Sequence, residues 1–290
     1  MIIDAHVHLW KRQAGLVDGM PVYPLKNGRS MLKGEVRQML PPYMTDNQNT
    51  ARRLISNMDF ALVSGAVVTQ EYMDGNQDAY LRFARRSYPD RLRVCALYEE
   101  KGEVDARGMD GIKIVAERLK DRDLTKHEAV FAQADREGKF ISADLYPGDE
   151  QAASLREMIE QYPNLRIAIG HFAMITVAGW QEVVKLARYP NVRIESGGIT
   201  WLFNSEYYPY PSAVKAICAA RDLCGMDKLM WGSDYPRTMT AITYRMSWDF
   251  LERTDLLTGE EKNQFLFENA RAFYRFGALP EIKPVRHMAE

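Results

Sequence analysis

Eight short apolar segments recur along the 290-residue chain, and each ends at a polar residue, a glycine or a proline. Their β-branched content is typical of buried strands. The segments cover residues 2–8, 61–70, 92–98, 111–115, 139–147, 165–172, 191–198 and 228–236. Helix-like stretches lie between them, at 77–89, 126–139, 150–163 and 178–190. This alternation predicts parallel βα units, in which each helix returns the chain to the start of the next strand.

Eight such strands favour a closed (β/α)8 barrel, the TIM-barrel fold, over an open doubly wound sheet. An open sheet that binds dinucleotides carries a glycine-rich phosphate loop after its first strand, whereas His8 is followed here by Leu-Trp-Lys. Thr125 and Glu128 have the spacing of a capping box and predict the start of the second helix-like stretch. We find no internal repeat, low-complexity segment or linker, and therefore expect residues 1–290 to form one α/β domain.

The segment 9–50 is too long and too rich in proline for a simple connection between a strand and a helix. In a (β/α)8 barrel, this connection leaves the face at which catalytic residues gather. Long loops at such a face commonly act as lids or substrate walls. We therefore expect a long first βα loop over the catalytic mouth.

Charge and composition exclude several classes of partner. The chain holds 38 basic and 39 acidic residues, for a net charge of -1, which indicates no nucleic acid and no anionic membrane as a partner. No apolar run reaches the ~18 residues that span a membrane, and the N-terminus lacks the features of a signal peptide. Three cysteines, Cys95, Cys218 and Cys224, make no even disulfide framework, which favours a cytoplasmic location. The expected partner is a small-molecule substrate, and a homo-oligomer stays possible.

Histidines stand at the ends of two predicted strands. In a strand, alternate residues share a face, so His6 and His8 both point to one side of the first strand. The same rule groups Ile167, Ile169 and His171 on the sixth strand, with the histidine last. Since catalytic residues of such barrels lie at the carboxyl ends of the strands, all three imidazoles are expected at the mouth.

An aspartate completes this group from the eighth strand. Alternation places Met230, Gly232 and Asp234 on one face, with the aspartate at the end. Asp4 precedes His6 by two residues, and we expect it to accept a hydrogen bond and support the site rather than to take part in the chemistry. The candidate catalytic and metal-binding residues are therefore His6, His8, His171 and Asp234.

Other polar side chains on the strands are candidates for binding substrate. Lys113 on the fourth strand is expected to face the mouth, because an ammonium group under the helices would lack water. Glu195 on the seventh strand invites the same argument. On the fifth strand, alternation points Ser142, Asp144 and Tyr146 inward. Together these residues predict a polar pocket.

Arg237 directly follows the corner at the end of the eighth strand and is expected to border this pocket. The aromatic residues that could stack against a sugar ring are Trp10, Trp201, Tyr207 and Tyr208. The two remaining histidines, His127 and His287, are expected at the surface.

The segments "DAHVHLW", "IGHF" and "LMWGSDYP" resemble the amidohydrolase superfamily, specifically its amidohydrolase-2 branch. Residues 67–97 are similar to the second βα unit and third strand of that branch, and residues 265–276 to its closing helix. Within the branch, the chain is most similar to lactonases of sugar-acid and pyrone-dicarboxylate catabolism. This resemblance implies a (β/α)8 barrel that holds one or two divalent metals on His6, His8, His171 and Asp234, with the aspartate taking a proton from the attacking water.

The chain also departs from the pattern of this superfamily. Many metal-bearing members place a histidine at the end of strand five, where Asp144 stands here. Binuclear members use a carboxylated strand-four lysine with histidines on strands five and six, and only Lys113 and His171 match. The resemblance thus implies at most one zinc or manganese ion, on His6, His8 and Asp234 with help from His171 or Asp144. Since the resembling lactonases do not always require a metal, a metal-independent site stays open.

The preferred hypothesis is a hydrolase that opens a sugar-derived or related carboxylated lactone. Asp234 would activate the water, and the three histidines would stabilise the developing oxyanion. Tyr146, Lys113 or Arg237 would protonate the departing alkoxide or hold a carboxylate. A metal-dependent decarboxylase of an unsaturated or aromatic acid is the first alternative, and a catalytically inactive barrel that binds a sugar acid is the second.

Overall fold

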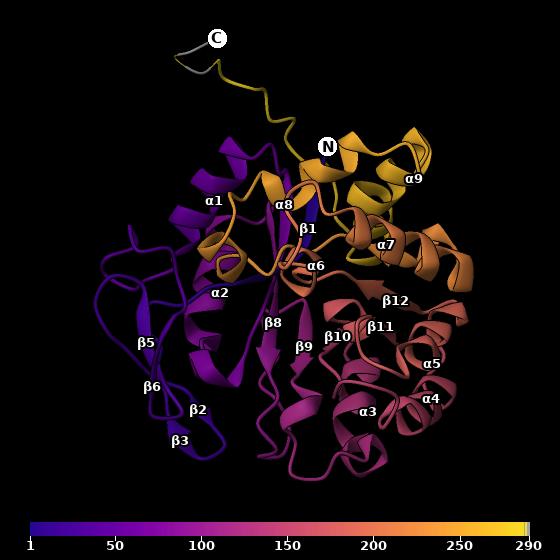
Figure 1. Ribbon diagram of the computed structural model, residues 1–290. Helices are drawn as coiled ribbons and strands as arrows, with labels where there is room; N and C mark the ends of the chain where they lie inside the picture. Colours follow the sequence, from indigo (N-terminus) through magenta and orange to yellow (C-terminus); the bar gives the residue numbers. More distant parts are fainter. Residues whose placement is uncertain (287, 289–290) are drawn as a thin grey trace.

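Eight parallel strands form the centre of the computed structural model, which describes residues 1–286 and 288 (Figure 1). In sheet order these are β1 (Ile3–His8), β7 (Gly65–Thr69), β8 (Leu92–Leu97), β9 (Gly111–Ile114), β10 (Phe140–Ala143), β11 (Arg166–Ile169), β12 (Val192–Glu195) and β13 (Leu229–Met230). Each segment that the sequence predicted as a strand contains one of them.

Backbone hydrogen bonds close this sheet between its last strand and its first. The Ala5 amide donates to the Trp231 carbonyl at 2.9 Å, and the His8 amide donates to the Tyr235 carbonyl at 2.8 Å. A return bond of 3.0 Å runs from the Asp234 amide to the His6 carbonyl. The strands therefore form the predicted (β/α)8 barrel, and closure brings the ends of β1 and β13 side by side.

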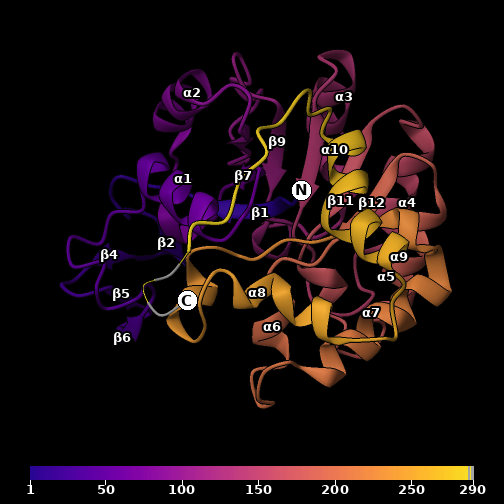
Figure 2. The same cartoon turned by 90° about the horizontal axis from the view of Figure 1, so that it is seen from above.

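Helices surround the strands when the molecule is viewed from above (Figure 2). They are α1 (Ala51–Phe60), α2 (Asp78–Ser87), α3 (Glu128–Arg136), α4 (Ala152–Gln161), α5 (Trp180–Lys185), α6 (Ile199–Leu202), α7 (Pro211–Cys224), α8 (Met246–Asp249), α9 (Gly259–Asn263) and α10 (Asn269–Phe273). The connection from β8 to β9, residues 98–110, is described throughout and contains no helix. Within the described part of the chain, the helices are all too short or too polar to cross a membrane.

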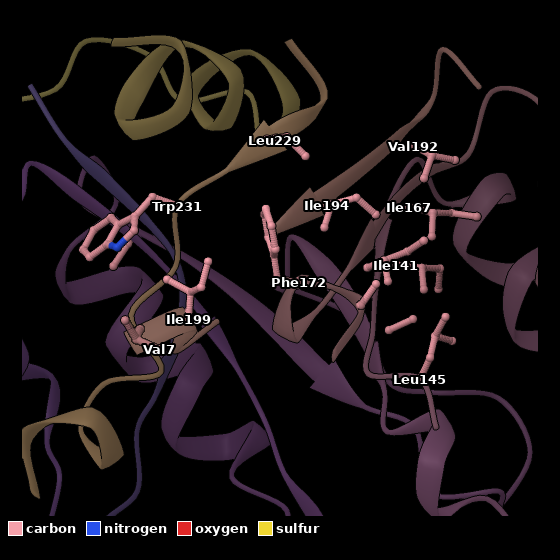
Figure 3. Close-up of a cluster of buried hydrophobic side chains, with 14 of the residues drawn as sticks. Val7, Ile141, Leu145, Ile167, Phe172, Val192, Ile194, Ile199, Leu229 and Trp231 are labelled. Carbon is pink, nitrogen blue, oxygen red and sulfur yellow. The ribbon is translucent and has the colours of Figure 1, made fainter. Parts of the chain in front are cut away.

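The core lies on both sides of the strands. Outward-facing residues such as Val7, Ile141 and Ile167 pack under the helices, together with Phe172 (Figure 3). A second cluster fills the interior where the strands begin, and its members are Ile3, Ala5, Val67, Cys95, Phe140, Ala168, Met230 and residues of 267–276. The interior is thus solid at one end, which leaves the opposite end, where the strands terminate, for polar groups.

The long segment after β1 folds into two small sheets. β2 (Leu16–Val17) pairs with β3 (Met20–Pro21), and β4 (Tyr23–Pro24), β5 (Arg29–Leu32) and β6 (Glu35–Gln38) form an antiparallel sheet at one side of the barrel (Figure 1). The backbone at Gly15 lies so close to the Tyr72 carbonyl that a Cβ atom would overlap it. Because Tyr72 follows β7, the segment packs at the carboxyl ends of the strands.

Two local predictions are wrong. α3 begins at Glu128, after a short turn (Leu124–His127) that is capped by Asp123 rather than by Thr125. Asp123 is the cap because its carboxylate accepts hydrogen bonds from both the amide and the hydroxyl of Thr125, at 3.0 and 2.7 Å. A capping box does occur in the chain, between Thr258 and Glu261 at the start of α9.

His127 was expected at the surface, but it is buried. Its ring lies 3.0 Å from the Tyr98 hydroxyl and 2.8 Å from the Asp121 carbonyl, so both nitrogens have partners. The prediction for His287 concerns a residue outside the described part of the chain.

Candidate active site

Six ionisable side chains meet where the strands end. They are His6 and His8 of β1, Asp144 just after β10, His171 just after β11, Glu195 at the end of β12 and Asp234 just after β13. His171 has a side chain that is 21% exposed, whereas the other five are almost fully buried. The site therefore opens to solvent on the side of His171.

An irregularity in β1 brings both of its histidines to the interior. Ile3 and Ala5 face the lower core, and the pairing register then shifts between Asp4 and Val7. A bulge of this kind exchanges the faces of a strand, so His6 and His8 point inward beyond it. Strict alternation from Ile3 onward would have turned both imidazoles outward.

Asp4 holds this bulge against the end of β13. Its carboxylate accepts hydrogen bonds from the amides of His6 and Ser233, at 3.1 and 2.9 Å, and from the hydroxyls of Ser233 and Tyr244. Burial raises the pKa of Asp4 to about 6, although these donors act in the opposite direction. As its place in the sequence suggested, Asp4 accepts hydrogen bonds behind the site.

Nitrogen and oxygen atoms of His6, His8 and Asp234 converge. The Nε2 atoms of the two histidines are 3.1 Å apart, and His8 Nε2 is 3.0 Å from Asp234 Oδ1. Glu195 accepts a hydrogen bond from His6 Nδ1 at 2.6 Å, which leaves the lone pair of His6 on Nε2. Asp234 Oδ1 is buried and has no hydrogen-bond partner. The Nε2 atoms of two histidines and a carboxylate oxygen that accepts no hydrogen bond fit a zinc or manganese ion, with Glu195 orienting one ligand.

The protonation states agree with this donor set. Burial and the nearby Arg237 hold the pKa of His8 well below its ordinary value, so His8 is neutral and its contact with Asp234 is not an ion pair. Burial alone would raise the pKa of Asp234, but the nearby positive charges of Arg237 and His171 oppose it, and this pKa lies well below its usual range. Asp234 is therefore an anion with one unpartnered oxygen.

Asp144 and His171 form a second group beside the first. Asp144 contacts the Lys113 ammonium at 2.6 Å and His171 Nε2 at 3.3 Å. His171 Nδ1 donates to the Gly197 carbonyl at 2.8 Å, which fixes the ring. Burial alone would lower the pKa of His171, but Asp144 and the neighbouring carboxylates raise it to about 10. His171 therefore carries a positive charge toward the open side of the site.

Lys113 lies beneath this group and faces the interior, as predicted. Its side chain is fully buried, with Asp144 at 2.6 Å and the Ser142 hydroxyl at 3.5 Å. Burial alone would raise the pKa of Asp144, but Lys113 and His171 hold it well below the usual range. Lys113 thus neutralises Asp144 from below and does not reach solvent.

His171 lies at the mouth as expected, but not because it shares a face with Ile167 and Ile169. Ile167 and Ile169 point outward into the core under the helices (Figure 3 labels Ile167), and Ala168 and Gly170 point inward. A Cβ atom at Gly170 would overlap the Asp144 carboxylate. The backbone then turns into the left-handed region, with φ near 50° from His171 onward, and this turn carries the imidazole to the mouth.

β13 follows the predicted alternation more closely. Met230 lies in the interior cluster, and a Cβ atom at Gly232 would stand 2.8 Å from Glu195 Oε2 and from the His6 side chain. Asp234 again has a left-handed backbone, with φ of 59°. Glycine at position 232 is therefore required by the close approach of Glu195 and His6.

Arg237 lies beside Asp234 in the wall of the site, and Trp10 lies beside Arg237. Arg237 Nη1 is 3.8 Å from Asp234 Oδ1, and its guanidinium lies 5.6 Å from the centre of the Trp10 ring. Trp10 is fully buried and donates its indole N–H to the Asn47 carbonyl at 2.9 Å. It therefore offers no open face to a sugar, and its packing holds the guanidinium.

Arg237 is fixed from its other side by a buried relay. Its Nη2 atom is 2.7 Å from Asp74 Oδ2, and Gln13 donates to Asp74 Oδ1 at 2.8 Å. Gln13 in turn accepts a hydrogen bond of 2.6 Å from the Ser30 hydroxyl of β5. The small sheets are thus connected to Asp234 through Gln13, Asp74 and Arg237.

Three tyrosines that the sequence placed at the site lie elsewhere. Tyr146 is partly exposed and packs under the Arg122 guanidinium, at 3.7 Å, rather than among the site residues. Tyr208 donates its hydroxyl to Asp249 of α8 at 2.8 Å, and Tyr207 is almost fully exposed. Tyr146 therefore packs against Arg122 and Tyr208 bonds to α8, while Tyr207 faces solvent.

Trp201 does reach the site, by a contact that the sequence did not suggest. Its indole N–H donates to Asp234 Oδ2 at 3.1 Å, so it orients the carboxylate instead of stacking on a sugar. Asp74, which bonds Arg237, was not predicted at all. It follows β7, and the rule that functional groups stand at strand ends could have found it.

Comparison with known proteins gives one family and several similar folds. The model of the amidohydrolase family (Amidohydro_2) matches residues 3–276. An L-fucono-1,5-lactonase of Burkholderia ambifaria is 33% identical over 92 residues, a match that spans only 29% of this chain and 30% of the lactonase.

Two solved structures resemble the whole barrel. A probable 2-pyrone-4,6-dicarboxylic acid hydrolase from Acinetobacter baumannii, with citric acid bound, gives a TM-score of 0.72 at 19% identity and covers 95% of this chain and 99% of its own. An amidohydrolase from Burkholderia multivorans with bound zinc gives 0.69 at 14% identity, over 96% of this chain and all of its own. At these identities the similarity establishes the fold.

Proposed function

Because the chain belongs to the amidohydrolase family, we propose that it is a hydrolase that opens a lactone, sugar-derived or carboxylated. The observation that carries this proposal is the ionised, buried Asp234, whose Oδ1 accepts no hydrogen bond and lies beside His8, with His6 next to it. Oδ1 has two lone pairs and accepts no hydrogen bond, so one lone pair would face a metal while the other takes the proton of water. The partial likeness to a fuconolactonase and the fold of a pyrone-dicarboxylate hydrolase support an ester ring as substrate.

His6, His8 and Asp234 would hold a divalent metal, which would polarise the ester carbonyl and lower the pKa of water. Asp234 takes the proton of the attacking water as the new C–O bond forms at the carbonyl carbon. His171, charged and on the open side, stabilises the oxyanion that develops, an interaction typically worth about 3–4 kcal/mol. When the ring C–O bond breaks, the Asp234 carboxyl returns its proton to the departing alkoxide.

Arg237 and Trp201 keep Asp234 in place during these steps. The indole N–H bonds Oδ2, so that Oδ1 is the oxygen that stays available. Asp144, itself paired with Lys113, stabilises the charge of His171 from the buried side. The chain therefore supplies the base, the oxyanion stabiliser and the orientation of both.

The experiment that tests this function combines a lactone panel with metal analysis. Purified protein is mixed with aldonolactones and with 2-pyrone-4,6-dicarboxylate, and acid release is followed with a pH indicator. Ring opening of at least one lactone supports the proposal. Release of carbon dioxide from an aromatic or unsaturated acid with no lactone opened would favour the decarboxylase, and binding of sugar acids without turnover would favour an inactive barrel.

Glu195→Gln is expected to weaken metal binding by about 10–100-fold, because the amide no longer accepts the His6 Nδ1 proton as a carboxylate does. Competition with a chromophoric chelator measures the affinity without reference to activity. Glu103→Gln, at a side chain that is 79% exposed, is the matched control and should bind metal as the wild type does. Equal affinities in the two variants would show that Glu195 does not orient a metal ligand.

A further inference from the structure

The small antiparallel sheet after β1 ends in an open edge. In its order β4-β5-β6, the strand β6 has a neighbour on one side only within the described chain, and all four of its residues are exposed. An edge strand of this kind presents unpaired N–H and C=O groups that can pair with another strand. β6 is therefore the part of the molecule best placed to accept one.

One face of the same sheet carries an apolar row. The register pairs Tyr23 with Met31 and Met31 with Val36, so these three side chains lie side by side on one face. Tyr23 is 47% exposed and Val36 is 54% exposed. The opposite face includes Ser30, which is buried and bonds Gln13, so the apolar row faces away from the barrel.

The hairpin turn decides which backbone groups point to the open edge. Lys33 and Gly34 both have positive φ, 50° and 79°, as in the two-residue type I′ turn that joins β5 to β6. Such a turn closes on a hydrogen-bonded pair, here Leu32 with Glu35. Since hydrogen-bonded and non-bonded pairs alternate, the N–H and C=O groups of Val36 point outward from the edge.

We propose that β6 pairs in antiparallel fashion with β6 of a second copy of this chain, about a two-fold axis at Val36. The two small sheets then become one sheet of six strands, and Val36 meets its symmetry mate so that the two apolar rows form one continuous row. Backbone bonds run between the two copies of Val36 in both directions. The interface is isologous, as a two-fold axis requires.

Charge selects this register over the neighbouring one. With the axis at Val36, Glu35 stands opposite Arg37 of the partner subunit, and the reverse pair lies symmetrically across the axis. Moving the axis to Arg37 also satisfies the backbone groups, but it places two arginines directly opposite each other. Like charges in that position are destabilising, so the register centred on Val36 is favoured.

Sedimentation velocity of the full chain over about a hundredfold range of concentration tests the proposal. The wild type is expected to sediment at twice the chain mass of 33.3 kDa at the upper end of the range. Val36→Lys places two ammonium groups at the axis and is expected to give a monomer. Leu256→Lys is the matched control, because its side chain is 55% exposed and lies outside the small sheets, and it should remain dimeric.

A charge exchange tests the register itself. Arg37→Glu places like charges opposite each other and is expected to dissociate the dimer, and Glu35→Arg is expected to do the same. The double variant restores opposite charges across the axis and should recover the dimer. Far-UV circular dichroism checks whether every variant is folded.

Three results would overturn the proposal. The wild type could be monomeric throughout the range, which would leave the edge to a different partner or to none. A dimer that survives both Val36→Lys and Arg37→Glu would place its interface elsewhere. Dissociation by the single charge variants without recovery in the double variant would contradict the register.

Discussion

Asp234→Asn is expected to lower the turnover of the lactone substrate by about 10²–10⁴-fold. This is the range of rate enhancement that a general base contributes. The amide cannot take the proton of the attacking water, and it presents either an N–H₂ group or a weaker oxygen at the position of Oδ1. The fold should survive, because asparagine tolerates the left-handed backbone that Asp234 adopts at φ of 59°. The initial rate of acid release on the best lactone of the panel gives the measurement.

Metal content and substrate affinity must be followed in the same variant. A loss of kcat with KM nearly unchanged indicates the missing base, whereas a loss that disappears when metal is added in excess indicates only a weakened ligand. Asp222→Asn, at a side chain that is 68% exposed, is the control and should keep full activity. Near-normal turnover of Asp234→Asn would exclude this carboxylate as the base.

Lys113→Met is expected to reduce the free energy of unfolding by about 3–5 kcal/mol. The lysine is fully buried and 2.6 Å from Asp144, so the substitution leaves a carboxylate in the interior with only His171 as a charged partner. Methionine has a similar volume, which keeps the loss of packing small. Urea unfolding followed by tryptophan fluorescence measures the change.

Asp144→Asn in the same chain separates charge from packing. If the cost of Lys113→Met comes from the unpaired carboxylate, the double variant should be more stable than Lys113→Met alone. Lys101→Met is the control at a side chain that is 77% exposed, and its effect should stay within about 0.5 kcal/mol. A Lys113→Met protein as stable as the wild type would mean that the interior around Asp144 is hydrated.

The sequence predicted the barrel because its signal is repeated eight times, and each predicted segment holds a strand. Alternation was less reliable at the strand ends. His171 comes to the mouth through a left-handed turn after Gly170, and His6 comes through a bulge, neither of which alternation describes. Such irregularities depend on contacts with other strands, as when the Asp144 carboxylate occupies the space beside Gly170.

Long-range contacts account for the residues that the sequence could not assign. Trp201 was expected to stack on a substrate, but its indole bonds Asp234, 33 residues further along the chain. Asp74 stands just after a predicted strand, but nothing local shows that it meets Arg237, 163 residues away. Asp123 rather than Thr125 caps the turn before α3, because two residues of similar capping ability lie within one turn. Pairings of this kind are decided by the closed barrel rather than by the local pattern.

The relay from Ser30 through Gln13, Asp74 and Arg237 to Asp234 bears on how this barrel can be engineered. Loops on such barrels are often exchanged to alter substrate preference. Here a graft that replaces the first loop also removes Gln13, which leaves one oxygen of the buried Asp74 without its donor and loosens Arg237. A chimaera should therefore carry the loop and the turn after β7 as one transplanted unit.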